Sequence, residues 1–196
     1  MYTTTSTHTS LLARLADGGD PTAWREFSER YSELIRGFAQ RRGLQPADCD
    51  DITQDVLLSL SKALPGFRYD PSKGKFRSFL KTVTVRRIIE RRRQKKGEVS
   101  AQPIEQAARV AADQPDAEAA WEKEWRRYHL RQALRTIHGE FNENDRQAFQ
   151  WYALERRDAA GTATALGLSV DHVYQAKSRI TKRLAQIIAA QVRDEG

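Results

Sequence analysis

The stretch "DDITQDVLLSLSKALPGFRYDPSKGKFRSFLKTV", residues 50–83, holds two apolar patterns of helical period on either side of a turn. In the first pattern, apolar residues recur at steps of three and four between residues 52 and 64. Pro65 and Gly66 end that helix, because proline has no amide hydrogen to donate and glycine relaxes the backbone. The same steps return between residues 76 and 83. The stretch therefore predicts two amphipathic helices joined by a turn.

Helical spacing extends over much of the remaining chain. It occurs between residues 24 and 38 and again between residues 121 and 137, whereas no run of alternating polarity is long enough to indicate a sheet. Residues 97–116 are rich in Ala, Gln, Pro and acid, which is typical of a linker. We therefore predict an all-α fold of two small helical domains, residues 10–96 and 117–192, joined by a flexible linker.

The overall composition indicates a folded protein with an anionic partner. The 196 residues are 39% hydrophobic and 30% charged, with a net charge of +7. Cys49 is the single cysteine, so an intrachain disulfide and a cysteine-based metal cluster are both excluded. We interpret Cys49 as a small, partly buried side chain in preference to a redox sensor. The N-terminal residues lack the features of a signal peptide, and no stretch approaches the roughly 20 apolar residues of a membrane span. We expect a cytoplasmic protein, monomeric when free, with no cofactor or metal.

Charge is distributed unevenly along the chain. Residues 73–96 contain eleven Lys and Arg against one acid, Glu90. Residues 97–124 contain seven acids against two basic residues. The first of these segments is a concentrated basic surface of the kind that binds nucleic acid. A solvated basic tail or a membrane-surface patch is the alternative, although Ile88 and Ile89 offer only a narrow apolar face for a membrane.

The segment "GTATALGLSVDHVYQAKSRITKRL", residues 161–184, has the pattern of a helix-turn-helix. A small residue, Ala163, stands where two helices would cross, and Gly167 suits the positive φ of the turn. Ser169 is placed to cap the second helix, and the aliphatic Val173 would seal the pair. Such a motif places its second helix in the DNA major groove.

The outward face of this second helix carries DNA-binding chemistry. If Val173, Ala176, Ile180 and Leu184 face inward, Gln175 and Arg179 are suited to base contacts. Lys177, Lys182 and Arg183 are suited to phosphate contacts. An ordinary amphipathic helix with a solvated basic face is the alternative. The candidate contacts are Asp171, His172, Tyr174, Gln175, Ser178, Arg179 and Lys182.

An acidic face precedes the basic segment. Asp51 and Asp55 stand four residues apart, with Gln54 beside them, so they share one side of a helix. A hard-cation site is weakly supported, because such sites gather oxygen ligands from a loop. Acids that favour the helix N-terminus are a second interpretation. A face that docks on a basic partner protein is the third.

Three motifs in order resemble the bacterial RNA polymerase sigma factors, in particular their small two-domain extracytoplasmic-function group. The motifs are "DDITQDVLL", "FRYDPSKGKFRSFLKTV" and the helix-turn-helix "GLSVDHVYQAKSRITKRL". Phe79 stands where the family usually has Trp, and Arg86 replaces an Asn often found there. The matching positions are Asp51, Gln54, Asp55, Phe67, Asp70, Pro71, Gly74, Phe76, Arg77 and Leu80.

The resemblance implies a function for each domain. The first domain would bind the β′ clamp helices of core RNA polymerase through Asp51, Gln54, Asp55 and Leu58, and would melt the −10 promoter element. The second would recognise the −35 element and meet the β subunit flap. We expect Phe76 and Phe79 mainly to brace the turn from the core. The −10 candidates are Ser72, Lys73, Gly74, Lys75, Phe76, Phe79, Arg86 and Arg87.

Two rival classes follow from the same residues. A helix-turn-helix regulator would bind duplex DNA independently of polymerase. An enzyme is disfavoured, because the four histidines are dispersed and no phosphate-binding glycine loop or nucleophile–base spacing occurs. Many members of the sigma group are held by an anti-sigma protein, so we include such an inhibitor among the candidate partners.

Overall fold

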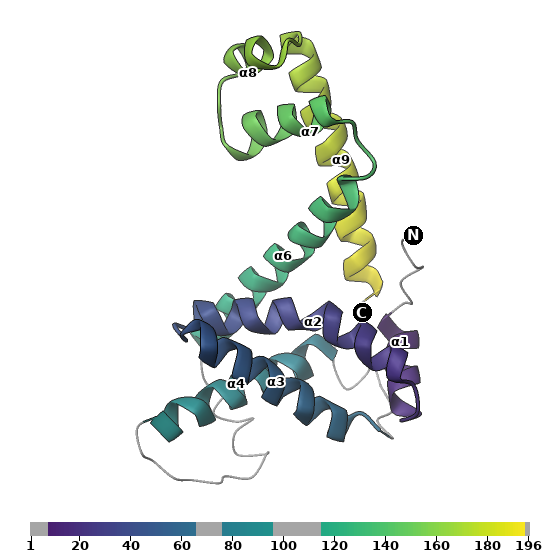
Figure 1. Ribbon diagram of the computed structural model, residues 1–196, viewed down its shortest axis with the longest axis vertical. Helices are drawn as coiled ribbons and strands as arrows, with labels where there is room; N and C mark the ends of the chain where they lie inside the picture. The colour runs from purple at the N-terminus through teal and green to yellow at the C-terminus, as the bar shows by residue number, and fades with distance from the viewer. Residues whose placement is uncertain (1–7, 66–75, 96–114, 195–196) are drawn as a thin grey trace. The chain divides into compact units, whose positions relative to one another are not determined.

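A computed structural model describes residues 8–65, 76–95 and 115–194 of the chain (Figure 1). Every regular element in these ranges is a helix, which confirms the predicted all-α fold. None of the described helices combines the length and the apolar character that a membrane crossing requires. The chain divides into two compact units, which we call unit 1 (Met1–Tyr128 with Asp194–Gly196) and unit 2 (His129–Arg193).

Unit 1 is built around the long helix α2. Helices α1, α3 and α4 each pack against α2, and α3 also packs against α4. Their apolar faces share one core, which contains Phe27, Tyr31, Leu34 and Phe38 of α2. The elements are α1 (His8–Ala16), α2 (Pro21–Arg41), α3 (Pro46–Ala63), α4 (Phe76–Lys95) and the first part of α6 (Pro115–Ile137).

Local sequence signals set where these helices begin. The Oδ1 atom of Asp20 accepts hydrogen bonds from the amides of Thr22 and Ala23, each 2.9 Å long, and Pro21 occupies the first helical position. Helix α3 likewise begins with a proline, Pro46. These signals fix the first turn of each helix and therefore the face that it buries.

Helix α1 was not predicted from the sequence. Its residues Leu11, Leu12 and Leu15 are buried in the core of unit 1. Their spacing of one and three residues is a helical signal, but the helix is only nine residues long. Such a short helix depends on packing for its stability, so its pattern alone is weak evidence.

The first part of α6 belongs to the core of unit 1. Trp121 is 1% exposed and meets Phe38 edge-on, with ring centroids 5.0 Å apart. Glu124 is fully buried and pairs with Arg41, and it lies against Gly37. The sequence predicts that the second domain starts at residue 117. The functional division of the chain stays a prediction, whereas the compact units divide after Tyr128.

Unit 2 contains the rest of α6 and then four further helical elements. Asn142 caps α7, because its Oδ1 accepts from the amide of Asp145 at 2.8 Å. Ala133, Ile137, Phe149 and Ile180 form its main apolar cluster, together with Leu184 and Ile187. The elements are α7 (Glu143–Phe149), the π-helix η2 (Gln150–Leu154), α8 (Ala159–Leu166) and α9 (Val170–Asp194).

Gly37 allows α6 to approach α2, and this contact is testable. A Cβ at this position would lie 2.4 Å from Oε1 of the buried Glu124, whose ion pair with Arg41 leaves it little freedom to move. We expect Gly37→Ala to lower the free energy of unfolding by about 1–3 kcal/mol. The better helix propensity of alanine, about 1 kcal/mol, offsets only part of this loss. Urea denaturation followed by circular dichroism measures the change.

Gly19→Ala is the matched control, because nothing lies within 4 Å of a Cβ at Gly19 and its φ is not positive. We expect this variant to keep the wild-type stability. Equal stability of both variants and the wild type would show that close packing against Glu124 is unimportant.

Candidate functional site

The predicted docking residues lie together on the outer face of α3. Asp51, Gln54, Asp55 and Leu58 are all exposed, while Ile52, Val56 and Leu60 on the opposite face are buried. Leu58 is 55% exposed and adds an apolar side chain to this face. We call these four exposed residues the α3 face. It combines two carboxylates, an amide and one apolar side chain, which suits a basic partner surface with an apolar spot.

Asp48 and Asp51, at the start of α3, form ion pairs with the end of α4. The Arg91 guanidinium bonds to Asp48 at 3.0 Å and also pairs with Asp51, and Lys95 pairs with Asp48. A hydrogen bond from Lys95, and another from Arg91, hold the pKa of Asp48 below its ordinary value of 3.8, although burial acts in the opposite direction. Asp55, the next acid along the α3 face, is exposed.

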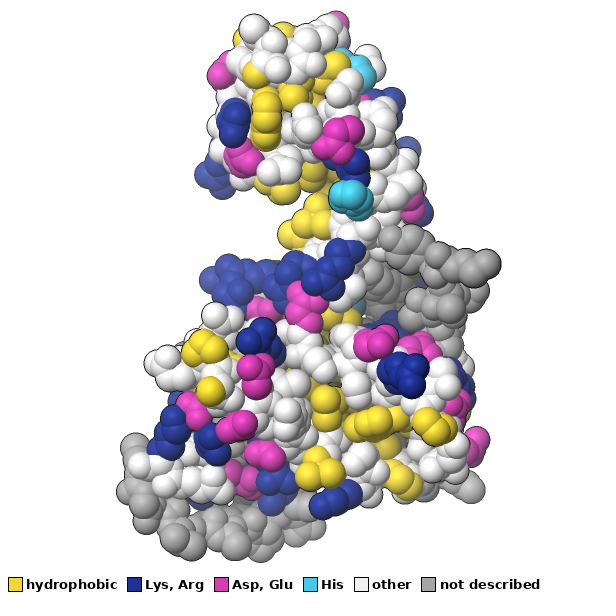
Figure 2. Space-filling model, in the orientation of Figure 1, with side chains coloured by type: hydrophobic (Ala, Val, Ile, Leu, Met, Phe, Trp, Pro, Cys, Tyr) yellow, Lys and Arg dark blue, Asp and Glu magenta, His cyan; other side chains and the backbone are white. Residues whose placement is uncertain are grey.

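The predicted DNA contacts Arg86 and Arg87 also have partners within unit 1. Nε of Arg86 and Nη1 of Arg87 each donate to Glu90 at 2.7 Å. Nη2 of Arg87 donates to Oγ of Ser59 on α3 at 2.6 Å. On the face that Figure 2 presents, Lys and Arg side chains of unit 1 accordingly lie next to Asp and Glu side chains. The basic segment is therefore partly neutralised by its own domain.

Phe76 and Phe79 begin α4 at the core of unit 1. Phe76 is 2% exposed, and its ring lies 5.9 Å from the rings of both Phe27 and Tyr31. Phe79 packs beside it at 6.0 Å and is only half-buried. Both rings therefore pack with the core of unit 1, and bracing of the preceding turn by this pair stays a prediction, because that turn lies outside the described residues. A direct contact between DNA and the Phe76 ring would require that ring to leave the core.

The turn itself, with Ser72, Lys73, Gly74 and Lys75, lies outside the described residues.

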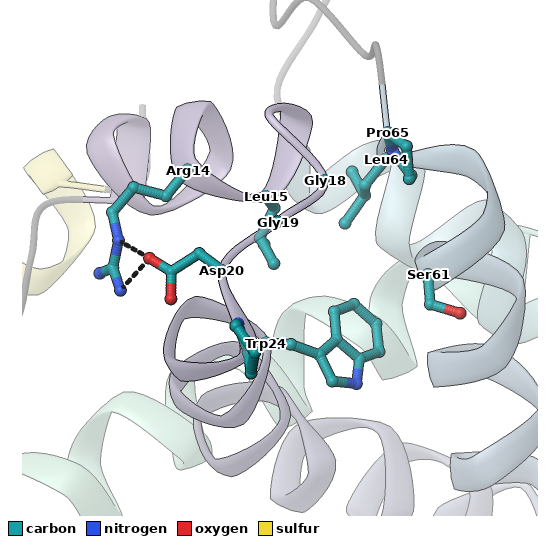
Figure 3. Close-up of a pocket in the computed structure, with 10 residues that line it drawn as sticks. Arg14, Leu15, Gly18, Gly19, Asp20, Trp24, Ser61, Leu64 and Pro65 are labelled. Carbon is teal, nitrogen blue, oxygen red and sulfur yellow. Dashed lines mark hydrogen bonds and ion pairs between the residues drawn. The ribbon is translucent and has the colours of Figure 1, made fainter.

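A pocket of about 270 Å³ adjoins Pro65, where α3 has ended (Figure 3). The Trp24 ring extends from α2 toward the side of α3 that carries Ser61, as Figure 3 shows. The two charged residues that line the pocket, Arg14 and Asp20, pair with each other at 2.7 Å. Sites for small molecules usually exceed roughly 300 Å³, and we assign this pocket no ligand.

In unit 2, the turn between α8 and α9 has the geometry that its sequence predicts. Gly167 adopts a left-handed conformation, with φ of +66°, immediately after α8. Oγ of Ser169 accepts from the amide of His172 at 3.1 Å and so caps the start of α9. The predicted inward residues of α9 are buried, and they are Val173, Ala176, Ile180 and Leu184.

The outward face of α9 carries the predicted DNA contacts. His172 is half-buried, and Tyr174 meets Tyr152 edge-on at 5.5 Å. The Lys177 ammonium lies 5.4 Å from the centre of the Tyr152 ring, so η2 supports this part of α9. Apart from His172, the predicted contacts on this face are all exposed, and they are Asp171, Tyr174, Gln175, Ser178, Arg179 and Lys182.

Two acids whose importance the sequence analysis missed are buried in the described structure. Glu124 ties α6 to Arg41 in unit 1. Asp145 of α7 contacts both His172 and Arg179 of α9. Neither sequence motif nor spacing signals these contacts, because the partners stand far apart along the chain. Among the described residues, no group of three or more His, Cys, Asp or Glu is arranged to hold a metal ion.

One segment of unit 1 matches a known protein family. Residues 27–98 match the family model of sigma-70 region 2, and this segment lies within unit 1. The match confirms the resemblance to sigma factors and supports a role in transcription initiation. A solved structure, described as CnrH in complex with the cytosolic domain of CnrY, is similar with a TM-score of 0.38 and 19% identity. The alignment covers 94% of this chain and 99% of that chain. No curated protein sequence matches the chain.

The lowered pKa of Asp48 predicts how pH affects stability. The paired, ionised carboxylate stabilises the folded state above pH 3.8, and this contribution disappears as pH falls through the lower folded-state pKa. Asp48→Asn lacks the contribution at every pH. We therefore expect wild type to be the more stable at pH 7, with the difference shrinking steadily below about pH 4. Urea denaturation at pH 7, 5 and 3 measures it.

Asp50→Asn serves as the control, because Asp50 and its partner Arg36 are both more than half exposed. Exposed ion pairs contribute little to stability. A stability difference between wild type and Asp48→Asn that stays constant from pH 7 to pH 3 would contradict the assignment.

Proposed function

We propose that this protein is a transcription initiation factor of the extracytoplasmic-function sigma group, which binds core RNA polymerase and directs it to promoters. The observation that carries the proposal is the match of residues 27–98 to sigma-70 region 2. The exposed acidic α3 face lies within the matched segment and supports the same conclusion. The sigma factors are a class of transcription factors without catalytic activity of their own.

The α3 face would dock on core polymerase. Asp55 would accept hydrogen bonds from a basic helical surface such as the β′ clamp helices, Gln54 would accept or donate them, and Leu58 would supply the buried apolar contact. Protein interfaces commonly combine apolar contacts with polar contacts around them. Negative charge on this face also keeps free DNA away from it.

Residues of the turn before α4 would melt the −10 element. Opening a promoter without hydrolysis requires a grip on the phosphates and a pocket for an unstacked base. Lys73 and Lys75 on a glycine-containing turn would approach phosphates closely. Extruding a base costs a few kcal/mol, and stacking it on an aromatic surface returns roughly 1–3 kcal/mol. Phe76 and Phe79 would support this turn, and Arg86 and Arg87 would contact the duplex upstream.

Helix α9 would recognise the −35 element. Gln175 and Arg179 are exposed on the face opposite the buried Val173 and Ile180. An amide side chain pairs with adenine and a guanidinium with guanine in the major groove, so these two residues would supply base selectivity. Lys182 would contact phosphate, and unit 2 would also meet the β flap. An anti-sigma protein that covers these surfaces would inhibit the factor.

Reconstitution with core RNA polymerase tests the proposal. We expect the protein to bind core enzyme and to produce run-off transcripts from promoters of its own genome. A gel shift separates this from a regulator that acts alone, since a sigma factor should bind free promoter DNA poorly without core enzyme. Tight duplex binding without polymerase, or the absence of any core binding, would contradict the proposal.

Asp55→Arg should weaken core binding at least about tenfold, because it places a positive charge against a basic partner surface. Its matched control is Glu29→Arg, which makes the same charge change at an exposed position of α2. The affinity of each variant for core enzyme is measured by fluorescence anisotropy. Equal effects of the two variants would show that general charge, and not the α3 face, governs binding.

Gln175→Ala should change promoter selectivity and leave core binding intact. Loss of a bidentate base contact is worth about 1–3 kcal/mol of discrimination. Run-off transcription from a library randomised over the −35 element measures the change. Loss of core binding in Gln175→Ala as well as in Asp55→Arg would indicate misfolding and not separate roles.

A further inference from the structure

Asp145 is a buried carboxylate at the junction of α7 and α9 in unit 2. Its side chain is 5% exposed. Oδ1 lies 2.7 Å from Nε2 of His172, and Nη2 of Arg179 donates to both carboxylate oxygens at 3.0 Å. A buried carboxylate needs such partners, because an isolated one is strongly disfavoured away from water. One side chain of α7 therefore holds two side chains of the outward face of α9.

Asp145 is itself held in place. The amide of Asp145 donates to Oδ1 of Asn142 at 2.8 Å, and Nδ2 of Asn142 lies 3.3 Å from Oδ2 of Asp145. These contacts belong to the cap that starts α7, so the carboxylate is attached to a fixed helix end. Its direction is therefore set by the backbone of unit 2.

The contact fixes Arg179 without hiding it. The side chain of Arg179 remains 55% exposed. Both hydrogen bonds use Nη2, so Asp145 does not engage the N–H donors of Nε and Nη1, which can still donate to a ligand. An exposed arginine otherwise samples many rotamers, and ordering it on binding costs conformational entropy. The carboxylate thus orients the fork before any ligand arrives.

We propose that Asp145 is a positioning residue that sets the base selectivity of α9 by orienting Arg179 and His172; this rests on the proposed function. The pair confines Arg179 to one direction, toward base edges. Its negative charge also weakens the attraction of Arg179 for phosphates in other geometries. Asp145 therefore increases discrimination between sequences and reduces general affinity for DNA.

A second ion pair on the same helix provides a matched control. Arg183 donates to both oxygens of Glu140 at 2.6 and 2.7 Å. Arg183 is a candidate phosphate contact, and phosphate contacts carry no sequence information. Glu140→Gln therefore removes a carboxylate from an arginine of α9 and should change affinity equally for all sequences, with selectivity unchanged.

The test uses the full chain bound to core polymerase and a library randomised over the −35 element. We expect Asp145→Asn to lower discrimination about tenfold at the position where Arg179→Ala lowers it, with total binding kept or increased. At that position the double variant Asp145→Asn/Arg179→Ala should match Arg179→Ala alone, because Asp145 acts there through Arg179. A purely structural role would instead reduce binding to all sequences alike.

The outcomes separate the inference from the proposed function. If wild-type holoenzyme shows no −35 discrimination, the proposed function fails. If Arg179→Ala alters selectivity but Asp145→Asn does not, only the inference is overturned. Circular dichroism checks that each variant folds.

A second measurement needs no variant. In the wild-type protein, ¹⁵N relaxation should show that Nε of Arg179 is less mobile than Nε of the exposed Arg156. Equal mobility of the two would overturn the inference.

Discussion

The aromatic packing around α2 is the interaction on which unit 1 depends. Phe27 and Tyr31 contact Phe76 at the start of α4, and Phe38 contacts Trp121 of α6. Two segments that stand far apart in the chain, α4 and α6, therefore meet on one helix. Buried aromatic side chains contribute large areas to a core, so this packing holds α4 and the first part of α6 against α2. The α3 face and the basic residues of α4 have fixed positions because the aromatic core behind them is shared.

Charge in this protein is organised as pairs more than as a continuous patch. The net charge of +7 and the run of arginines near residue 90 suggest an open basic surface. In the structure, Arg87 and Arg91 are held by acids or hydroxyls of their own unit. Fixed pairs give the basic side chains defined directions, and direction matters for the recognition of a shaped ligand. The acids that accompany them limit binding to arbitrary polyanions.

The sequence was sufficient for the fold class, for most helices and for the buried side of α9. Apolar periodicity carries that information, because burial of one helix face is a local pattern. It was also sufficient to place Asp51, Gln54, Asp55 and Leu58 on one exposed face. It was not sufficient for Asp145. Its partners stand 27 and 34 residues away, and only the packing of α7 on α9 brings them together.

Because Asp51 of the α3 face pairs with Arg91 of α4, binding of a partner to Asp51 and binding of an anion to Arg91 affect each other. A partner that takes Asp51 frees Nη2 of Arg91, whose Nε stays bonded to Asp48, and an anion that takes Nη2 of Arg91 frees Asp51. Whichever ligand arrives first bears the cost of breaking the pair, and the second does not. The two affinities therefore rise together, and by an equal factor in each direction. Since exposed pairs contribute roughly 0–1 kcal/mol, this cooperativity is small, a few-fold at most.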